Sequence, residues 1–484
     1  MNTYIGIDLG TSSVKLLLVG SDGGILKSVT KEYPICYPQS GWSEQNPEDW
    51  LLAVKSGINQ LIDGFSREKV KGLSFGGQMH GLVMLDENEN VIRPAILWND
   101  GRTQKQTDHL NGHIGKENLS KFTANIAFAG FTAPKILWVK ENEPENFAKI
   151  AKIMLPKDYI AYKLTGVHST DYSDASGMLL LDVQNKRWSK EMCEACFVQE
   201  KWLPKLYESF ECVGRVKEEY GLPNAIVTAG AGDNAAAAIG TGTVKNGDCN
   251  ISLGTSGTVF IAQDKFSVDK NNALHSFAHA NGKYHLMGCI LSAASCNKWW
   301  SEEILKTTDF IKEQEGLDEI LGNNDLFFLP YLMGERSPHN DVNARGCFIG
   351  LSPTTTRKQM TLAVMEGVAF ALRDCVEVAK SNGLEITCAK ICGGGAKSTI
   401  WKKVIANVLG IPIYALCVEE GPAYGAAILA MVGANEYQTV DEATEKLVKT
   451  KDATLPNTIL TEKYETKYRR FTKLYPILKD FFNL

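Results

Sequence analysis

The sequence lacks an excess of charge of either sign. Its 484 residues include 51 lysines and arginines against 56 aspartates and glutamates, which gives a net charge of −5. Wrapping nucleic acid or coating anionic lipid needs a basic surplus, so we expect no nucleic-acid partner. No apolar run reaches the roughly 18 residues of a membrane span. The acidic residue Asp8 stands where a secretory leader would have its apolar stretch. We therefore expect a cytoplasmic protein without a membrane partner.

The sequence also lacks the usual motifs for cysteine-bound metals and for nucleotide-binding loops. The twelve cysteines are scattered, and only Cys193 and Cys196 form a CxxC pair. A zinc site would need a second pair or histidines at matching spacing, so we expect reduced thiols without a cysteine-bound metal. The sequence has no GxxxxGK[ST] motif and no strand ending in GxGxxG. Any ATP is therefore bound by another kind of loop.

The second half of the sequence repeats the organisation of the first half. Each half opens with two β-rich runs around an identical tetrapeptide, Leu9–Ser12 in one and Leu253–Ser256 in the other. A helical pattern follows in each half (49–62 and 360–379), and then a strand that runs into glycines (70–77 and 389–395). The chain is also too long for a single hydrophobic core. We predict an α/β fold of two duplicated domains, 1–246 and 247–484, that face a central cleft.

The repeated turns are candidate phosphate-binding elements. Their residues are small, so their backbone N–H groups can approach phosphate oxygens closely, although a hairpin turn without a ligand is an equal alternative. The residues in question are Gly10, Thr11 and Ser12 in the first half and Gly254 and Thr255 in the second. Asp8, a carboxylate inside an apolar strand, favours the functional interpretation, with Mg²⁺ as its natural partner. Ser252 takes its place in the second copy.

Two further glycine-rich strand ends carry candidate site residues. Asp233 follows Gly230-Ala231-Gly232 and precedes a helical pattern, so it is either an N-cap or a general base that accepts a proton from a substrate hydroxyl. Gly394, Gly395 and Ala396 follow a strand of the second half. They could pack against a base and ribose, or they could form a plain strand-to-helix turn.

Two polar loops of the first half are candidates for substrate recognition. His80 lies among Gln78 and three glycines, which suits hydrogen bonding to a polyol, whereas an isolated loop histidine is usually solvated. Trp98-Asn99-Asp100-Gly101-Arg102 clusters an aromatic ring, an amide, a carboxylate and a guanidinium. For Arg102 and Asp100 an ordinary surface ion pair is the simpler interpretation.

Taken together, these segments resemble the FGGY carbohydrate kinases, which share a ribonuclease-H-like ATPase core with actin, Hsp70 and hexokinase. The resemblance covers nearly the whole chain, and segments 130–142 and 346–366 fit the two patterns of the family. Four segments are similar to family members that act on D-xylulose, namely 78–81, 98–102, 155–159 and 292–296. The resemblance implies ATP- and Mg²⁺-dependent phosphorylation of D-xylulose to D-xylulose 5-phosphate in pentose catabolism.

The resemblance also implies roles for individual residues. Met79 and His80 would contact the ketose, and Asp233 would be the catalytic base, with Asn234 beside it in the sugar site. Asp8 would act at the Mg²⁺ and phosphate end. The nucleotide would be held by Gly10, Thr11, Ser12, Gly254, Thr255, Gly394, Gly395 and Ala396. Glycerol kinases carry an Arg-Glu pair in place of Met79-His80, which argues against glycerol as the substrate.

Two rival functions and one structural question stay open at this point. Another pentulose or hexulose kinase of the family would keep Asp8 and Asp233 and differ in the loops around Met79 and Trp98. A binding protein of the actin and Hsp70 type would use ATP hydrolysis to change conformation. The aromatic and lysine-rich segment 464–482 has helical spacing and either docks on the second domain or forms a subunit interface, so a homodimer is open as well.

Overall fold

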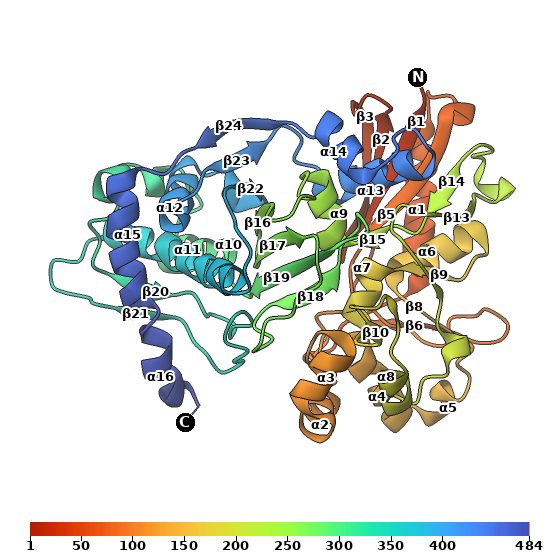
Figure 1. Cartoon of the computed structure of the whole chain (residues 1–484), viewed down its shortest axis with the longest axis horizontal. Coiled ribbons are helices and arrows are strands. Elements are labelled where there is room, and N and C mark those ends of the chain that lie inside the picture. The colour runs from red at the N-terminus through yellow and green to blue at the C-terminus, as the bar shows by residue number, and fades with distance from the viewer. Residues whose placement is uncertain (484) are drawn as a thin grey trace.

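The chain folds into two lobes, each built around one seven-stranded sheet (Figure 1). The computed structural model describes residues 1–483, apart from the side chain of Asp452. In Figure 1 the first lobe lies at the right and the second at the left, with helices α9 (Asp233–Gly240) and α13 (Gly421–Gly433) between them. Among these residues, no helix is both long enough and apolar enough to cross a bilayer.

The first-lobe sheet has the strand order β13-β14-β5-β1-β2-β3, and the short strand β15 also pairs with β5. Strands β1, β2 and β3 form an antiparallel meander, while β5 and β14 run parallel to β1. Its strands are β1 (Thr3–Leu9), β2 (Ser13–Gly20), β3 (Ile25–Glu32), β5 (Val70–Gly77), β13 (Cys212–Arg215), β14 (Ile226–Thr228) and β15 (Ala231–Gly232). The two β-rich runs predicted around Leu9–Ser12 are therefore confirmed as the antiparallel strands β1 and β2.

The second-lobe sheet repeats this arrangement in the order β24-β23-β22-β16-β17-β19-β18. Strands β16, β17 and β19 form the antiparallel meander, and β22 and β23 run parallel to β16. Its strands are β16 (Cys249–Leu253), β17 (Gly257–Gln263), β18 (His275–Ala278), β19 (Tyr284–Ile290), β22 (Ala389–Cys392), β23 (Ile413–Leu416) and β24 (Thr450–Thr454). The duplication predicted from the repeated turns is therefore confirmed in the sheet topology.

A long helix connects the meander to the next parallel strand in each lobe. These helices are α1 (Pro47–Ile62) and α11 (Arg357–Ser381), close to the predicted ranges. Asn46 caps α1 by accepting the N–H of Glu48, and a reciprocal pair of hydrogen bonds between Thr356 and Gln359 begins α11. Helix formation here follows from apolar spacing combined with polar N-caps.

Shorter strands and further helices surround the two sheets. The first lobe adds the short strands β4 (Glu44–Gln45), β6 (Val83–Leu85), β7 (Ala95–Ile96), β8 (Lys152–Met154), β9 (Ser169–Asp171), β10 (Leu181–Asp182), β11 (Arg187–Trp188) and β12 (Lys205–Tyr207). Its further helices are α2 (Gln104–His109), α3 (Lys116–Thr123), α4 (Thr132–Asn142), α5 (Pro144–Phe147), α6 (Pro156–Thr165), α7 (Tyr172–Ala175) and α8 (Lys190–Ala195). The second lobe adds α10 (Ala294–Lys298), η7 (Lys312–Gln314), β20 (Phe327–Leu329), β21 (Cys347–Ile349), η9 (Gly394–Lys397), α12 (Thr399–Leu409), α14 (Val440–Leu447), α15 (Thr458–Phe471) and α16 (Leu474–Phe482).

The lobes meet where helices α9 and α13 pack so closely that their backbones are in contact. A Cβ at Gly425 of α13 would lie 1.8 Å from the carbonyl oxygen of Ala236 in α9, and a Cβ at Gly6 of β1 would lie 1.8 Å from that of Ala423. Helix α13, which belongs to the second half of the sequence, thus packs on the first-lobe sheet. The predicted boundary at 246/247 falls between α9 and β16 and stays a prediction.

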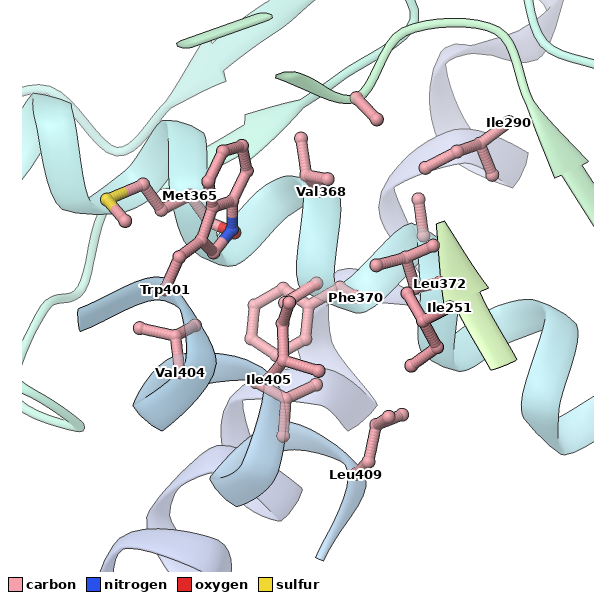
Figure 2. Close-up of a cluster of buried hydrophobic side chains, with 14 of the residues drawn as sticks. Ile251, Ile290, Met365, Val368, Phe370, Leu372, Trp401, Val404, Ile405 and Leu409 are labelled. Carbon is pink, nitrogen blue, oxygen red and sulfur yellow. The ribbon is translucent and has the colours of Figure 1, made fainter. Parts of the chain in front are cut away.

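The core of the second lobe lies between its sheet and helices α11 and α12. Figure 2 shows Ile251 of β16 facing Phe370 and Leu372 of α11, with Ile405 of α12 close by. Trp401 is buried, and its indole N–H donates to the carbonyl of Met365 at 3.0 Å. Tyr464, Tyr468, Phe471 and Tyr475 of the C-terminal helices also belong to this core. The docking interpretation of segment 464–482 is therefore confirmed for these residues.

Candidate active site between the lobes

A cavity of about 340 Å³ lies where the two sheets face each other, and it is called the cleft cavity below. The first lobe contributes Asp8, Lys15, Asp233 and Asn234, and the second contributes Ser252, Thr258, Phe260, Cys392 and Gly393. The segment that leads into α13 adds Glu419, Glu420, Gly421 and Pro422. The two carboxylates singled out from the sequence, Asp8 and Asp233, are thus brought together in one space.

Asp8 lies near the end of β1, level with Gly76 of β5 on one side and Lys15 of β2 on the other. A Cβ at Gly76 would lie 3.0 Å from the Cβ of Ala236 and 3.1 Å from that of Pro422, so the glycine lets these two residues pack against the strand. Desolvation raises the pKa of Asp8 from its usual 3.8 to about 7, and the negative charge of Asp233 adds to the shift. Lys15 counters that shift while it forms an ion pair with Glu420 at 2.7 Å. A raised pKa and an open cavity both indicate a carboxylate that needs a cationic partner.

Asp233 is presented by a sharp turn that only glycine tolerates. Gly230 has φ +74°, and a Cβ there would lie 2.8 Å from the carbonyl oxygen of Phe75. Short strand β15 then runs beside the end of β5, and α9 begins at Asp233 itself. The N-cap position belongs to Gly232, so the N-cap interpretation of Asp233 is wrong.

Within residues 1–483, hydrogen bonds reach only one of the two carboxyl oxygens of Asp233. The backbone N–H and the side-chain amide of Asn234 both donate to Oδ1, at 2.7 and 2.9 Å. Desolvation raises the pKa of Asp233 to about 6, although these two hydrogen bonds act in the opposite direction. Oδ2 is left to accept a proton from a ligand. A base with this pKa is ionised at neutral pH.

Met79 and His80 lie beside the same turn. A Cβ at Gly232 would come within 2.9 Å of the Met79 side chain, which shows how closely the methionine packs against the residue before Asp233. The His80 ring stacks on Phe131 with centroids 4.6 Å apart, and its Nδ1 lies 2.8 Å from the carbonyl oxygen of Gly177. Met79 and His80 both approach Gly177, and Met79 also packs against the residue before Asp233, while neither side chain lines the cleft cavity.

The tautomer of His80 follows from that contact. A carbonyl oxygen can only accept, so Nδ1 carries the hydrogen and Nε2 keeps a lone pair. Desolvation and the charge of Lys135 lower the pKa of His80 to about 3, so the ring is neutral at physiological pH. His80 therefore offers one fixed acceptor, which suits a hydroxyl group.

A larger cavity of about 820 Å³ lies within the second lobe and is called the second-lobe cavity. It begins beside the cleft cavity, because Gly393 lines one and Gly394 lines the other. Its lining includes the predicted Gly254, Thr255, Gly394 and Gly395. Ala396 belongs to the same short helix η9 but does not line the cavity. The volume is in the range of pockets that hold a nucleotide-sized ligand.

Sequence reasoning missed other residues of the second-lobe cavity. They come from α10, η7 and α12 and include Asn297, Lys298, Gln314, Ser398 and Trp401. The segment 292–296, already similar to family members, runs into the first two of these. Gln314 accepts a hydrogen bond from Ser398 at 2.5 Å, a contact between segments 84 residues apart that no local pattern announces.

The first hairpin turn differs from its second-lobe counterpart. The Thr11 hydroxyl accepts the indole N–H of Trp98 at 3.0 Å, and the Gly10 carbonyl accepts the hydroxyl of Tyr33 at 2.5 Å. Gly10, Thr11 and Ser12 do not line the cleft cavity or the second-lobe cavity. Their predicted nucleotide contact stays a prediction.

The Asp100–Arg102 pair is not at the surface, so that interpretation is wrong. The side chains are 0% and 1% exposed, and their ion pair measures 2.7 Å. Arg102 also pairs with Glu44 and lies 3.7 Å over the ring of Trp42. The pair is buried because the guanidinium is held between aromatic rings and two carboxylates.

Among the described residues, no group of three or more His, Cys, Asp or Glu side chains could enclose a metal ion. A single carboxylate is still enough for Mg²⁺, which takes one or two carboxylates together with the phosphates of a substrate and keeps several waters. Asp8 supplies such a carboxylate at the edge of the cleft cavity.

Comparison with known proteins places this chain in a family. The model of the FGGY family of carbohydrate kinases matches with its N-terminal domain over residues 3–240 and with its C-terminal domain over residues 249–434. The chain belongs to the FGGY family of carbohydrate kinases. Its fold is the duplicated α/β fold of sugar kinases, of the actin and hexokinase type, as predicted.

Similar proteins cover nearly the whole length of the chain. A xylulose kinase of Bacillus subtilis is 37% identical over 99% of this chain and 98% of its own length. A xylulose kinase of Lactococcus lactis is 40% identical over 98% of this chain and 97% of its own. A crystal structure from Brucella ovis, described as a "xyloylose kinase", has a TM-score of 0.94 and 39% identity, and covers 99% of this chain and 100% of that one.

Proposed function

We propose that this protein transfers the γ-phosphoryl group of ATP to the terminal hydroxyl of D-xylulose and releases D-xylulose 5-phosphate and ADP. One observation carries the proposal. The free oxygen of Asp233 and the carboxylate of Asp8 meet in a cavity that directly adjoins the nucleotide-sized cavity of the second lobe. Family membership and the long xylulose kinase relatives support the same reaction.

Asp233 acts as the general base in this mechanism. Its Oδ2 accepts the proton of the attacking hydroxyl while the phosphorus–oxygen bond to ADP breaks and the new bond to the sugar oxygen forms. Asn234 holds the other oxygen, so the carboxyl group cannot rotate freely. Mg²⁺, held at Asp8 when bound, would neutralise charge on the phosphates.

The sugar is oriented by residues of the first lobe. His80 Nε2 accepts a hydrogen bond from a hydroxyl group of the ketose, and Met79 supplies an apolar wall beside Asp233. The adenine nucleotide occupies the second-lobe cavity, with its phosphates near Gly254, Thr255, Gly394 and Gly395. Backbone N–H groups at these glycine-rich turns suit phosphate oxygens.

The same proposal extends to the setting of the enzyme. We place it in the cytoplasm, acting on two small molecules, with neither nucleic acid nor membrane as a partner. The net charge of −5 supports this assignment. A homodimer stays a prediction, and sedimentation analysis of the purified chain tests it.

A substrate panel tests the proposed function. ATP-dependent phosphate transfer is measured on D-xylulose, L-xylulose, D-ribulose, L-ribulose, L-fuculose, gluconate and glycerol, with Asp233→Ala as the blank. Turnover concentrated on D-xylulose and lost in the variant is the expected result. Strong turnover on another sugar would overturn the substrate assignment and leave the base in place. ATP hydrolysis without transfer to any sugar would favour the actin-type binding protein instead.

A further inference from the structure

A buried polar cluster lies directly behind the turn that presents Asp233. Lys157 of α6 forms an ion pair with Asp171 of β9 at 2.9 Å, and both side chains are 0% exposed. Asp158 accepts a second hydrogen bond from Lys157 at 2.7 Å. Removing such charges from water is expensive, so a cluster of this kind is weak evidence for stability alone. Its contacts to the backbone indicate a different purpose.

Two members of the cluster hold the turn itself. The ammonium group of Lys157 donates to the carbonyl oxygen of Ala229 at 3.2 Å. The hydroxyl of Ser173, on α7, accepts the backbone N–H of Gly232 at 3.2 Å. These two hydrogen bonds hold the turn at both of its ends, at Ala229, four residues before Asp233, and at Gly232, directly before it.

Asp171 connects the two residues that hold the turn, Lys157 and Ser173. Its Oδ2 accepts the hydroxyl of Ser173 at 2.5 Å, and its Oδ1 faces Lys157. Ser209 donates to the same Oδ2 at 2.8 Å. A continuous chain of polar contacts therefore runs from Ala229 through Lys157, Asp171 and Ser173 to the amide of Gly232.

We propose that Ser173, Asp171 and Lys157 are positioning residues, which fix the Ala229–Gly232 turn so that the free oxygen of Asp233 points at the substrate hydroxyl. The inference rests on the proposed function, because it gives Asp233 the role of base. A buried hydrogen-bonded network suits this task, because the low dielectric around Lys157 and its three neighbouring carboxylates, those of Asp158, Asp171 and Asp174, strengthens each contact. Small displacements of a catalytic group cost rate far more than they cost binding.

The sharpest test compares two serines. Ser173 and Ser209 are each 1% exposed and donate to the same oxygen of Asp171, but only the Ser173 hydroxyl reaches the turn. We expect Ser173→Ala to lower kcat about 10- to 100-fold with the KM for ATP unchanged. The acid limb of its pH profile should also move, because the surroundings of Asp233 change. Ser209→Ala should keep kcat within about twofold while losing a similar amount of thermal stability.

A double variant distinguishes positioning from general weakening. If Ser173 acts through Asp233, then Ser173→Ala should cause no further loss of kcat in an Asp233→Ala background. Multiplicative losses, or equal losses in Ser173→Ala and Ser209→Ala, would overturn the inference. An Asp233→Ala variant that turns over normally would instead overturn the proposed base, and the positioning role would fall with it.

A lysine pair provides a second route if the serine variant folds poorly. Lys157→Met removes the grip on Ala229, and Lys467→Met removes a buried ion pair with Glu366 in the second lobe, remote from the turn. Both variants should lower the melting temperature. Only Lys157→Met should lower kcat more than tenfold in the folded fraction at 20 °C, and equal kcat values in the two variants would contradict the inference.

Discussion

The ends of β1 and β16 occupy the same place in the two lobes and differ in chemistry. In the first lobe Asp8 stands opposite Lys15 of the neighbouring strand, and in the second Ser252 stands opposite Thr258. All four side chains line the cleft cavity. The duplicated backbone therefore carries a charged pair on one side and two hydroxyls on the other. This asymmetry suits phosphoryl transfer, because a carboxylate on β16 would add to the negative charge that Asp8, Asp233, Glu419 and Glu420 already bring to the cavity.

The largest expected effect comes from copying the second-lobe residue into the first. Asp8→Ser should lower kcat by about 10²- to 10³-fold, because charge on the transferring group loses its cationic partner. The backbone should tolerate the change, since serine already occupies the matching place in β16. Steady-state kinetics at several Mg²⁺ concentrations measures the loss. Unchanged kcat would remove Asp8 from the catalytic machinery.

The pH profile is the next test of the first-lobe carboxylates. The pKa of Asp233 is raised to about 6, and the base must be ionised to accept a proton. The ionised fraction of Asp233 should therefore fall about tenfold between pH 7 and pH 5, and activity should fall at least as much, because Asp8, whose pKa is raised to about 7, is protonated over the same range. The log of kcat/KM against pH, which reports the groups of the free enzyme, checks the prediction, with Asp233→Glu as the comparison. A profile flat down to pH 4.5 would contradict it.

His80→Ala should affect sugar binding more than chemistry. The variant removes the one acceptor that the Gly177 contact fixes, so the KM for D-xylulose should rise about tenfold while kcat changes less. Phe131→Leu is a useful comparison, because it removes the ring on which His80 stacks and keeps the acceptor. An unchanged KM in His80→Ala would exclude the residue from the sugar site.

The smallest expected effect comes from the reverse exchange. Ser252→Asp adds a negative charge to the second-lobe wall of the cleft cavity, and the KM for ATP should rise about fivefold through repulsion of the phosphates. Ser252→Asn adds similar bulk without charge and should leave that KM near its original value. Equal values for the two variants would show that the second lobe does not face the phosphates.

The sequence predicted these features where residues act locally or repeat. The repeated segments Leu9–Ser12 and Leu253–Ser256 predicted two sheets with the same topology. The glycines before Asp233 predicted a sharp turn that presents a carboxylate. Asp8 and Asp233 share one cavity because β1 and β15 both pair with the end of β5, an arrangement that the repeated turns do not predict.

Other features depend on contacts between distant segments. The burial of Arg102 comes from Trp42 and Glu44, and the second-lobe cavity draws on α10, η7 and α12. Helix α13 crosses to the first lobe because Gly425 permits backbone contact with α9. A single residue pattern holds no signal for such long-range packing.

The most direct test of the account separates binding from chemistry at Asp233. Isothermal titration gives the affinity for D-xylulose, and a single-turnover assay with ATP gives the rate of phosphoryl transfer, for the native protein and for Asp233→Asn. We predict an affinity within about fivefold of native and a transfer rate at least a hundredfold lower, because the amide keeps the shape of the side chain and cannot accept the proton. A transfer rate within tenfold of native would contradict the central claim that the first-lobe carboxylate is the base.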